Sequence, residues 1–263
     1  MRRSVYAVAL ALALVPLMAA EVKVDLTKER VGRPPETFEP MVGTWLVARD
    51  GGENVIMVDG RPWVASKDTP TKLLVQSARR LYGTSNEELM DNAKQFAYFP
   101  VAVLRSVPSF SDGTISVKFK TVAGDADRAS GILFNLKPNG DWLAARYNDT
   151  EGNLGLWEFH NGIRRLLTFS DRTKVQFTLD RAAYHELKLE IEGANLKVSV
   201  DGVVGIQYVL GSPPRPARSG AAPNPDLFPE NNPVLRPPVN GRIGLWAKTD
   251  STSYFKDYVV VTK

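Results

Sequence analysis

Six residues between positions 135 and 160 have side chains of the types that recognise sugars. They are Asn135, Trp142, Arg146, Asn148, Glu158 and His160. A pyranose presents an apolar face that stacks on an indole and a rim of hydroxyl groups that need fixed donors and acceptors. The set offers both kinds of contact, so we predict that it forms a glycan-binding site.

Glu158 and His160 are also the candidate catalytic residues if the protein acts on glycosides, because either side chain can transfer a proton. A purely structural alternative uses the same residues. Arg146 and Glu158 would form a cross-strand ion pair on a solvated face, with Trp142 at its edge. The sequence leaves both interpretations open.

A metal site has weak support. Asp125 and Asp127, next to Gly124, are hard oxygen ligands of the kind that bind calcium in loops, but the remaining ligands are not evident. The chain has no cysteine, which excludes disulfides and thiolate metal sites. Calcium is therefore the only cofactor that the sequence suggests.

His185 and the glutamates that follow it favour structure over catalysis. His185 and Glu186 begin a zinc-protease motif, but Leu189 stands where the second histidine ligand is required. Glu186, Glu190 and Glu192 alternate with apolar residues, which places them on the solvated face of a strand. We expect no zinc and no catalytic carboxylate pair in this segment.

Several other functional classes lack their motifs. The sequence contains no Gly-rich dinucleotide or phosphate loop and no Gly-x-Ser-x-Gly elbow. The net charge is only +4, and the positive residues are spread along the chain. A nucleic-acid partner is therefore not expected.

Short alternating β-strands position the candidate site. Segments 132–137, 141–148, 153–160 and 163–169 are separated by Gly- and Asn-containing turns such as Asn161-Gly162. A symmetrical register for the hairpin of 141–148 and 153–160 pairs even positions with even positions. That register predicts one polar face carrying the six residues and one core face.

The rest of the chain has the same pattern. Alternation also predicts strands at 115–120, 187–191, 196–200, 203–210, 243–248 and 254–261, whereas the only helix start is at 85–90. Many strands joined by tight turns must bury one face against another sheet. We therefore predict an all-β, antiparallel two-sheet sandwich with one short helix.

The N-terminus resembles a secretory signal peptide. Residues 1–20 have two arginines, an apolar run and small residues near Ala20, the predicted cleavage point. We expect a periplasmic or extracellular protein without a membrane anchor after cleavage, although an uncleaved N-terminal anchor is the alternative. Residues 21–40 are predicted to be a leader that crosses the surface, and residues 41–263 to be a single domain.

Residues 211–240 contain nine of the eighteen prolines and lie between two predicted strands. Proline cannot donate to a strand ladder, so this Pro-rich insertion is predicted to be a stiff surface excursion. It is interpreted either as a solvated loop or as an arm that covers a site or contacts a protein partner.

Five strand signatures resemble the concanavalin A-like lectin/glucanase superfamily. They are DGTISVKF (112–119), SGILF (130–134), YHELKLEIEG (184–193), KVSVDG (197–202) and GRIGLW (241–246). The likeness spans about residues 41–263 and is strongest to laminin G-like jelly rolls and secreted bacterial 3-keto-disaccharide hydrolase domains. It implies a jelly roll whose concave sheet binds glycans, in some members with calcium at the rim.

The superfamily's catalytic signature is missing. No glutamate here has an aspartate two residues later, as the glucanase motif requires, and no active-site motif of the keto-glycoside branch can be matched. The first expectation is therefore a secreted protein whose partner is a carbohydrate. The alternatives are a hydrolase or lyase for keto-sugar glycosides and an envelope module that contacts a protein through residues 211–240.

Overall fold

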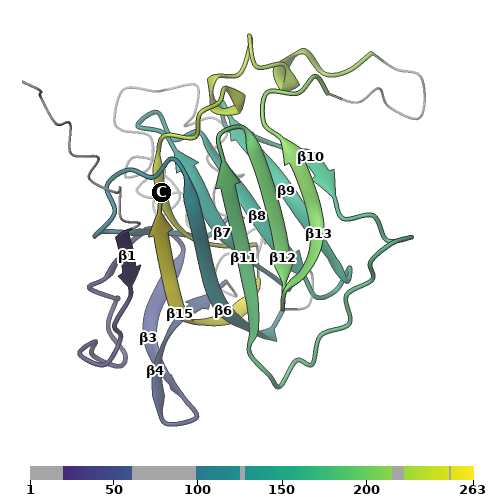
Figure 1. Ribbon diagram of the computed structural model, residues 1–263. Coiled ribbons are helices and arrows are strands. Elements are labelled where there is room, and N and C mark those ends of the chain that lie inside the picture. The colour runs from purple at the N-terminus through teal and green to yellow at the C-terminus, as the bar shows by residue number, and fades with distance from the viewer. Residues whose placement is uncertain (1–19, 61–98, 125–127, 215–221, 249) are drawn as a thin grey trace, which may run out of the picture.

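The protein is a sandwich of two antiparallel β-sheets packed face to face (Figure 1). The computed structural model describes residues 20–60, 99–124, 128–214, 222–248 and 250–263. The two-sheet prediction is confirmed. The helix predicted at 85–90 lies outside the described residues.

The first sheet has eight strands. In spatial order they are β13 (Val203–Val209), β12 (Asn195–Val200), β11 (His185–Glu192), β6 (Gly113–Ala123), β15 (Thr252–Thr262), β4 (Glu53–Asp59) and β3 (Thr44–Asp50), and β1 (Ala20–Lys23) also pairs with β15. Neighbouring strands are antiparallel throughout.

The second sheet has seven strands and carries most of the candidate site residues. Its order is β10 (Ile163–Phe169), β9 (Asn153–His160), β8 (Trp142–Asn148), β7 (Ala129–Leu136), β14 (Arg242–Ala247), β5 (Val101–Leu104) and β2 (Phe38–Val42). Strands β7 to β10 follow one another in the chain, so short hairpins position this half of the sheet.

The main core lies between the two sheets. Ile115, Val117 and Phe119 of β6 are buried and alternate with more exposed residues, as the period-two pattern predicts. They share one cluster with Leu143 and Ala145 of the opposite sheet. A second, smaller apolar cluster covers the outer face of the seven-stranded sheet and includes Trp142. This sheet is therefore apolar on both faces, which simple alternation does not indicate.

Residues 21–40 are more than a leader, so that prediction needs correction. Strand β1 pairs with β15, and β2 pairs with β5 in the other sheet. The β2 segment contains Pro40, which lies in an edge strand where a missing N–H is tolerated. Among the described residues, no helix has the length and apolar character needed to cross a membrane.

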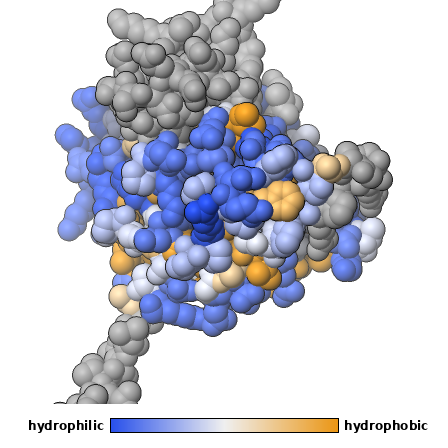
Figure 2. All heavy atoms as spheres, turned by 90° about the horizontal axis from the view of Figure 1, so that it is seen from above, coloured by the Kyte–Doolittle hydropathy of each residue, from blue (hydrophilic) through white to orange (hydrophobic). Residues whose placement is uncertain are grey.

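The described part of the Pro-rich insertion, predicted to be a surface excursion, closes one end of the sandwich (Figure 1). It contains two 3-10 turns, η2 (Pro225–Leu227) and η3 (Pro233–Leu235). Val234, Leu235 and Val239 are buried in the main core. Because these three residues are buried, the insertion is in part a structural cap of the core. Seen from above, the described surface of the molecule is mostly hydrophilic (Figure 2).

Candidate functional site

The hairpin of β8 and β9 has a register different from the predicted one. Asn148 pairs with Asn153 across the four-residue loop 149–152, and Trp142 pairs with Phe159. An even number of loop residues forces even positions to pair with odd positions. Residues of opposite parity on the two strands therefore share a face, and the symmetrical register was wrong.

This register divides the six predicted residues. Trp142 and Arg146 lie on the outer face of the sheet, whereas Glu158 and His160 lie on the inner face near the end covered by the insertion. The prediction that all six project from one surface is therefore wrong.

Glu158 lies at the centre of a buried ionic cluster. Its Oε1 accepts a hydrogen bond from Nη1 of Arg165 at 3.0 Å, and its Oε2 accepts one from Nδ2 of Asn232 at 3.0 Å. Arg165 also pairs with Asp226 in η2. The cluster joins strands β9 and β10 to the insertion, so it fixes the cap to the sheet. The alternative ion pair of Glu158 with Arg146 is not formed; Arg165 takes that place.

His160 is held beside this cluster. Its Nδ1 lies 2.7 Å from Oδ2 of Asp141, and its Nε2 lies 3.0 Å from Nδ2 of Asn161. The hydrogen bond with Asp141 raises the pKa of His160, although burial opposes the shift. Asp141 also accepts from the backbone N–H of Asn161, so it orients both the ring and the turn.

Burial raises the pKa of Glu158 to about 7, against the opposing effects of Arg165 and Asn232. The carboxyl can therefore bind and release a proton near neutral pH. Glu158 is 0% exposed and His160 only 7% exposed, however. A substrate atom has no direct access to either group in this structure.

The two asparagines of the predicted site stabilise the backbone. Asn135 has a positive φ of 53°, donates to the carbonyl of Val234 and accepts from the N–H of Asn240. Asn148 accepts from the N–H groups of Thr150 and Glu151 in the hairpin loop. Both side chains are buried, so neither is offered to a glycan.

Trp142 is a core residue of the outer cluster and not a stacking surface. Its ring lies parallel to that of Phe159, with centroids 4.8 Å apart, and makes edge contacts with Phe99 and Trp246. Only 1% of Trp142 is exposed. A sugar ring therefore cannot reach the indole.

The accessible aromatic surface lies one strand away, on β9 and β10. Trp157 is partly exposed, and its ring makes an edge contact with Phe169, which is 40% exposed. The guanidinium carbons of Arg164 and Arg146 lie 3.9 Å and 5.7 Å from the centroid of Trp157. We call Trp157, Phe169, Arg146 and Arg164 the platform.

Arg146 is a fixed part of the platform. Its Nη1 donates to Oδ1 of Asn153 at 2.7 Å, and its Nη2 donates to Oε2 of Glu151 at 2.9 Å. The side chain of Glu151 is 40% exposed. A partly exposed carboxylate and an aromatic surface are thus held together by a buried arginine, which is 2% exposed.

Of the platform residues, only Arg146 was predicted from the sequence. The symmetrical register places Trp157, at an odd position, on the face opposite the six predicted residues, and Phe169 and Arg164 were not singled out. Two signals in the sequence could have found them. The even length of loop 149–152 pairs even with odd positions, and the apolar Leu154 and Leu156 show that the even positions of β9 form its core face.

The metal candidates Asp125 and Asp127 lie outside the described residues. Within the described part of the chain, no three His, Asp or Glu residues are grouped so that they could hold a metal ion. His185 bonds Asp201 through Nδ1 and lies at the start of β11, as expected of a strand-edge residue. Glu190 pairs with Lys197 on the partly exposed face.

Comparison with known proteins identifies the fold. No protein-family model matches the sequence, and no curated protein sequence matches it significantly. The carbohydrate-binding module CBM66 from Bacillus subtilis matches at 15% identity, with a TM-score of 0.51, over 85% of this chain and 95% of the module. A β-glucanase from Bacillus licheniformis matches at 10% identity, with a TM-score of 0.40, over 92% of each chain. The chain shares the two-sheet jelly-roll fold of the CBM66 module, as its strand signatures predicted.

Proposed function

We propose that the protein binds carbohydrate at the platform on strands β8 to β10. The observation that carries this proposal is the partly exposed Trp157 with two guanidinium groups near its ring. The indole offers an apolar surface for the C–H face of a sugar, and the partly exposed side chains of Arg164 and Glu151 can hydrogen-bond its hydroxyls. The resemblance of the fold to CBM66, a carbohydrate-binding module, supports the same conclusion.

Glycan binding explains the site better than hydrolysis does. The pKa of Glu158, about 7, suits a general acid. Its carboxyl is nevertheless buried under the insertion and committed to Arg165 and Asn232. We therefore assign no catalytic step to Glu158 or His160 and treat their cluster as structural.

Replacement of Trp157 tests the proposal. We expect Trp157→Ala to weaken glycan binding at least tenfold, because the variant loses the central stacking surface. A glycan array with the wild-type protein first selects a ligand, and titration calorimetry then compares the Kd values of wild type and variant.

Tyr254→Ala is the matched control. Tyr254 is a half-buried aromatic residue of β15, in the other sheet, and its loss should leave the Kd unchanged. The proposal fails if the wild-type protein binds no glycan on the array. It also fails if both variants bind as tightly as the wild type.

We also propose that the chain is exported and cleaved after Ala20. Cleavage there removes two arginines, leaves a net charge of +2 and makes Glu21 the first residue of the mature chain. Glu21 lies in β1 and pairs with Val261, so the mature chain keeps most of this strand. Intact-mass analysis of the cell-envelope and extracellular fractions should find a chain starting at Glu21; an exported chain that retains residues 1–20 would contradict the proposal.

A further inference from the structure

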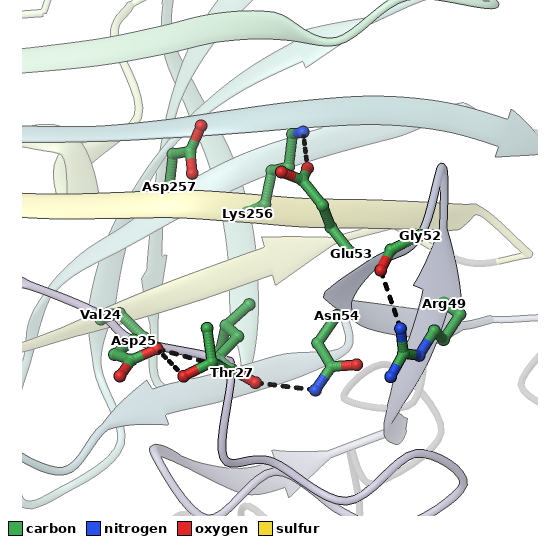
Figure 3. Close-up of a pocket in the computed structure, with 10 residues that line it drawn as sticks. Val24, Asp25, Thr27, Arg49, Gly52, Glu53, Asn54, Lys256 and Asp257 are labelled. Atoms are coloured by element: carbon green, nitrogen blue, oxygen red, sulfur yellow. Dashed lines mark hydrogen bonds and ion pairs between the residues drawn. The ribbon is translucent and has the colours of Figure 1, made fainter.

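A polar cavity of about 400 Å³ opens beside the eight-stranded sheet, which is not the sheet that carries the platform. It lies between residues 24–27, the hairpin of β3 and β4, and strand β15 (Figure 3). The polar side chains that line it are Asp25, Arg49, Glu53, Asn54, Lys256 and Asp257. The volume is at the small end of the range of ligand pockets, about 300–1,000 Å³, and suits a ligand of one or two rings.

A bulge in β15 builds one wall of the cavity. Lys256 and Asp257 are consecutive, and in a regular strand their side chains would point to opposite faces. Here Asp257 has a φ of 50°, and the pairing of β15 with β6 shifts after Lys256. Both side chains consequently line the cavity, and Figure 3 shows them on the same side of the strand. Bulges commonly redirect side chains towards binding sites in this way.

Asn54 supplies an acceptor at the wall of the cavity. Its Nδ2 donates to the carbonyls of Leu26 at 2.9 Å and Glu29 at 3.0 Å, which fixes the amide plane. Its Oδ1 is buried and has no hydrogen-bond partner among the residues that the structure describes. An unsatisfied buried acceptor destabilises the unliganded site, and a ligand hydroxyl, or a water that bridges to one, would satisfy it.

The charges around the cavity are mixed. Lys256 pairs with Glu53, and Asp257 pairs with Lys118 at 2.8 Å. Arg49 donates to the carbonyl of Gly52 through Nη1, and its remaining guanidinium N–H groups can act as further donors.

Asp25 provides a further acceptor, from the segment 24–27 that forms one wall of the cavity. Thr27 donates to Oδ1 of Asp25 from both its N–H and its hydroxyl, at 2.9 and 2.7 Å. The three carboxylates and two cations that line the cavity give it a net charge of −1, which disfavours a free anion as the ligand. An amine is the competing ligand class, and methylammonium tests it. Sugar hydroxyl groups match the set, because each can donate and accept at once.

We propose that this cavity binds a single neutral sugar residue through hydrogen bonds to its hydroxyl groups. Among the residues that the structure describes, no aromatic side chain lines the cavity, so the proposed recognition does not use stacking. The site is on a different sheet from the platform and would be a second, independent carbohydrate site. Occupied together, two sites on one molecule could bind separate parts of a glycan chain and raise its effective affinity.

The side-chain amide of Asn54 gives a local readout. We would titrate the ¹⁵N-labelled protein with glucose, galactose, mannose and fructose and record the amide spectrum. At least one sugar is expected to shift the Asn54 Nδ2 signals in a saturable manner at millimolar concentration. Arg49→Ala should weaken that binding about tenfold, because it removes charged hydrogen-bond donors.

Two control variants separate this site from other effects. Arg30→Ala removes an exposed arginine that pairs with Glu36 outside the cavity, and it should leave the Kd unchanged. Trp157→Ala should also leave it unchanged, so failure of the platform proposal would not affect this one. The inference is overturned if none of the four sugars gives a saturable shift of Asn54. It is likewise overturned if acetate or methylammonium alone gives one, or if Arg30→Ala weakens binding as much as Arg49→Ala.

Discussion

Glu158→Ala is expected to lower the free energy of unfolding by about 3 kcal/mol. The substitution leaves the guanidinium of Arg165, whose side chain is 11% exposed, with only Asp226 as an acidic partner. It also takes an acceptor from Asn232, which is fully buried. Above about pH 7, where Glu158 is ionised, breaking a buried ion pair by removing one partner typically costs about 3–5 kcal/mol, and the remaining pair with Asp226 places the effect at the lower end.

Urea unfolding followed by tryptophan fluorescence measures this loss. Glu190→Ala is the matched control, because Glu190 pairs with Lys197 at 2.9 Å while both side chains remain partly exposed. Exposed pairs contribute about 0–1 kcal/mol, so the control should lose no more than that. Equal losses in the two variants would show that the Glu158 cluster does not hold the insertion onto the sheet.

The same cluster makes stability depend on pH in a defined direction. The pKa of Glu158 is raised to about 7 in the fold, so between the ordinary value of 4.5 and about 7 the folded chain holds a proton that the unfolded chain releases. Stability from this group is complete below the unfolded value and is lost as the pH rises through about 7. The raised pKa of His160 acts in the same direction at somewhat higher pH. Glu158→Gln should therefore flatten the decline between about pH 5 and pH 7.

The strands were predictable because their signals are local. Alternation over a few residues marks a strand, and an Asn-Gly pair marks a tight turn wherever it occurs. At Asn161 and Gly162 the structure has φ values of 50° and 77°, as such a turn requires. Strands β8, β9 and β10 accordingly lie within one residue of their predicted bounds, whereas β7 begins three residues earlier than predicted.

The site depended on information that single-strand patterns do not carry. A shift of one residue between paired strands exchanges the two faces, and the assumed symmetry across loop 149–152 made that error. The contact between Asn232 and Glu158 joins residues 74 positions apart, and nothing in either local sequence specifies it. The strand pattern therefore predicts the fold, whereas which tryptophan is partly exposed depends on the register and on distant segments.

Trp142→Ala tests this distinction and should lower the free energy of unfolding by about 3–5 kcal/mol. The indole stacks on Phe159, contacts Phe99 and Trp246, and is almost completely buried, so its removal leaves a large cavity. Trp157→Ala should cost no more than about 1–2 kcal/mol, because its ring is partly exposed and its truncation opens to solvent. Glycan binding should show the reverse order: at a temperature where both variants are folded, Trp142→Ala retains the wild-type Kd and Trp157→Ala does not. If Trp142→Ala were stable but failed to bind, the indole of Trp142 would be a ligand contact after all, and the platform would be misplaced by one strand.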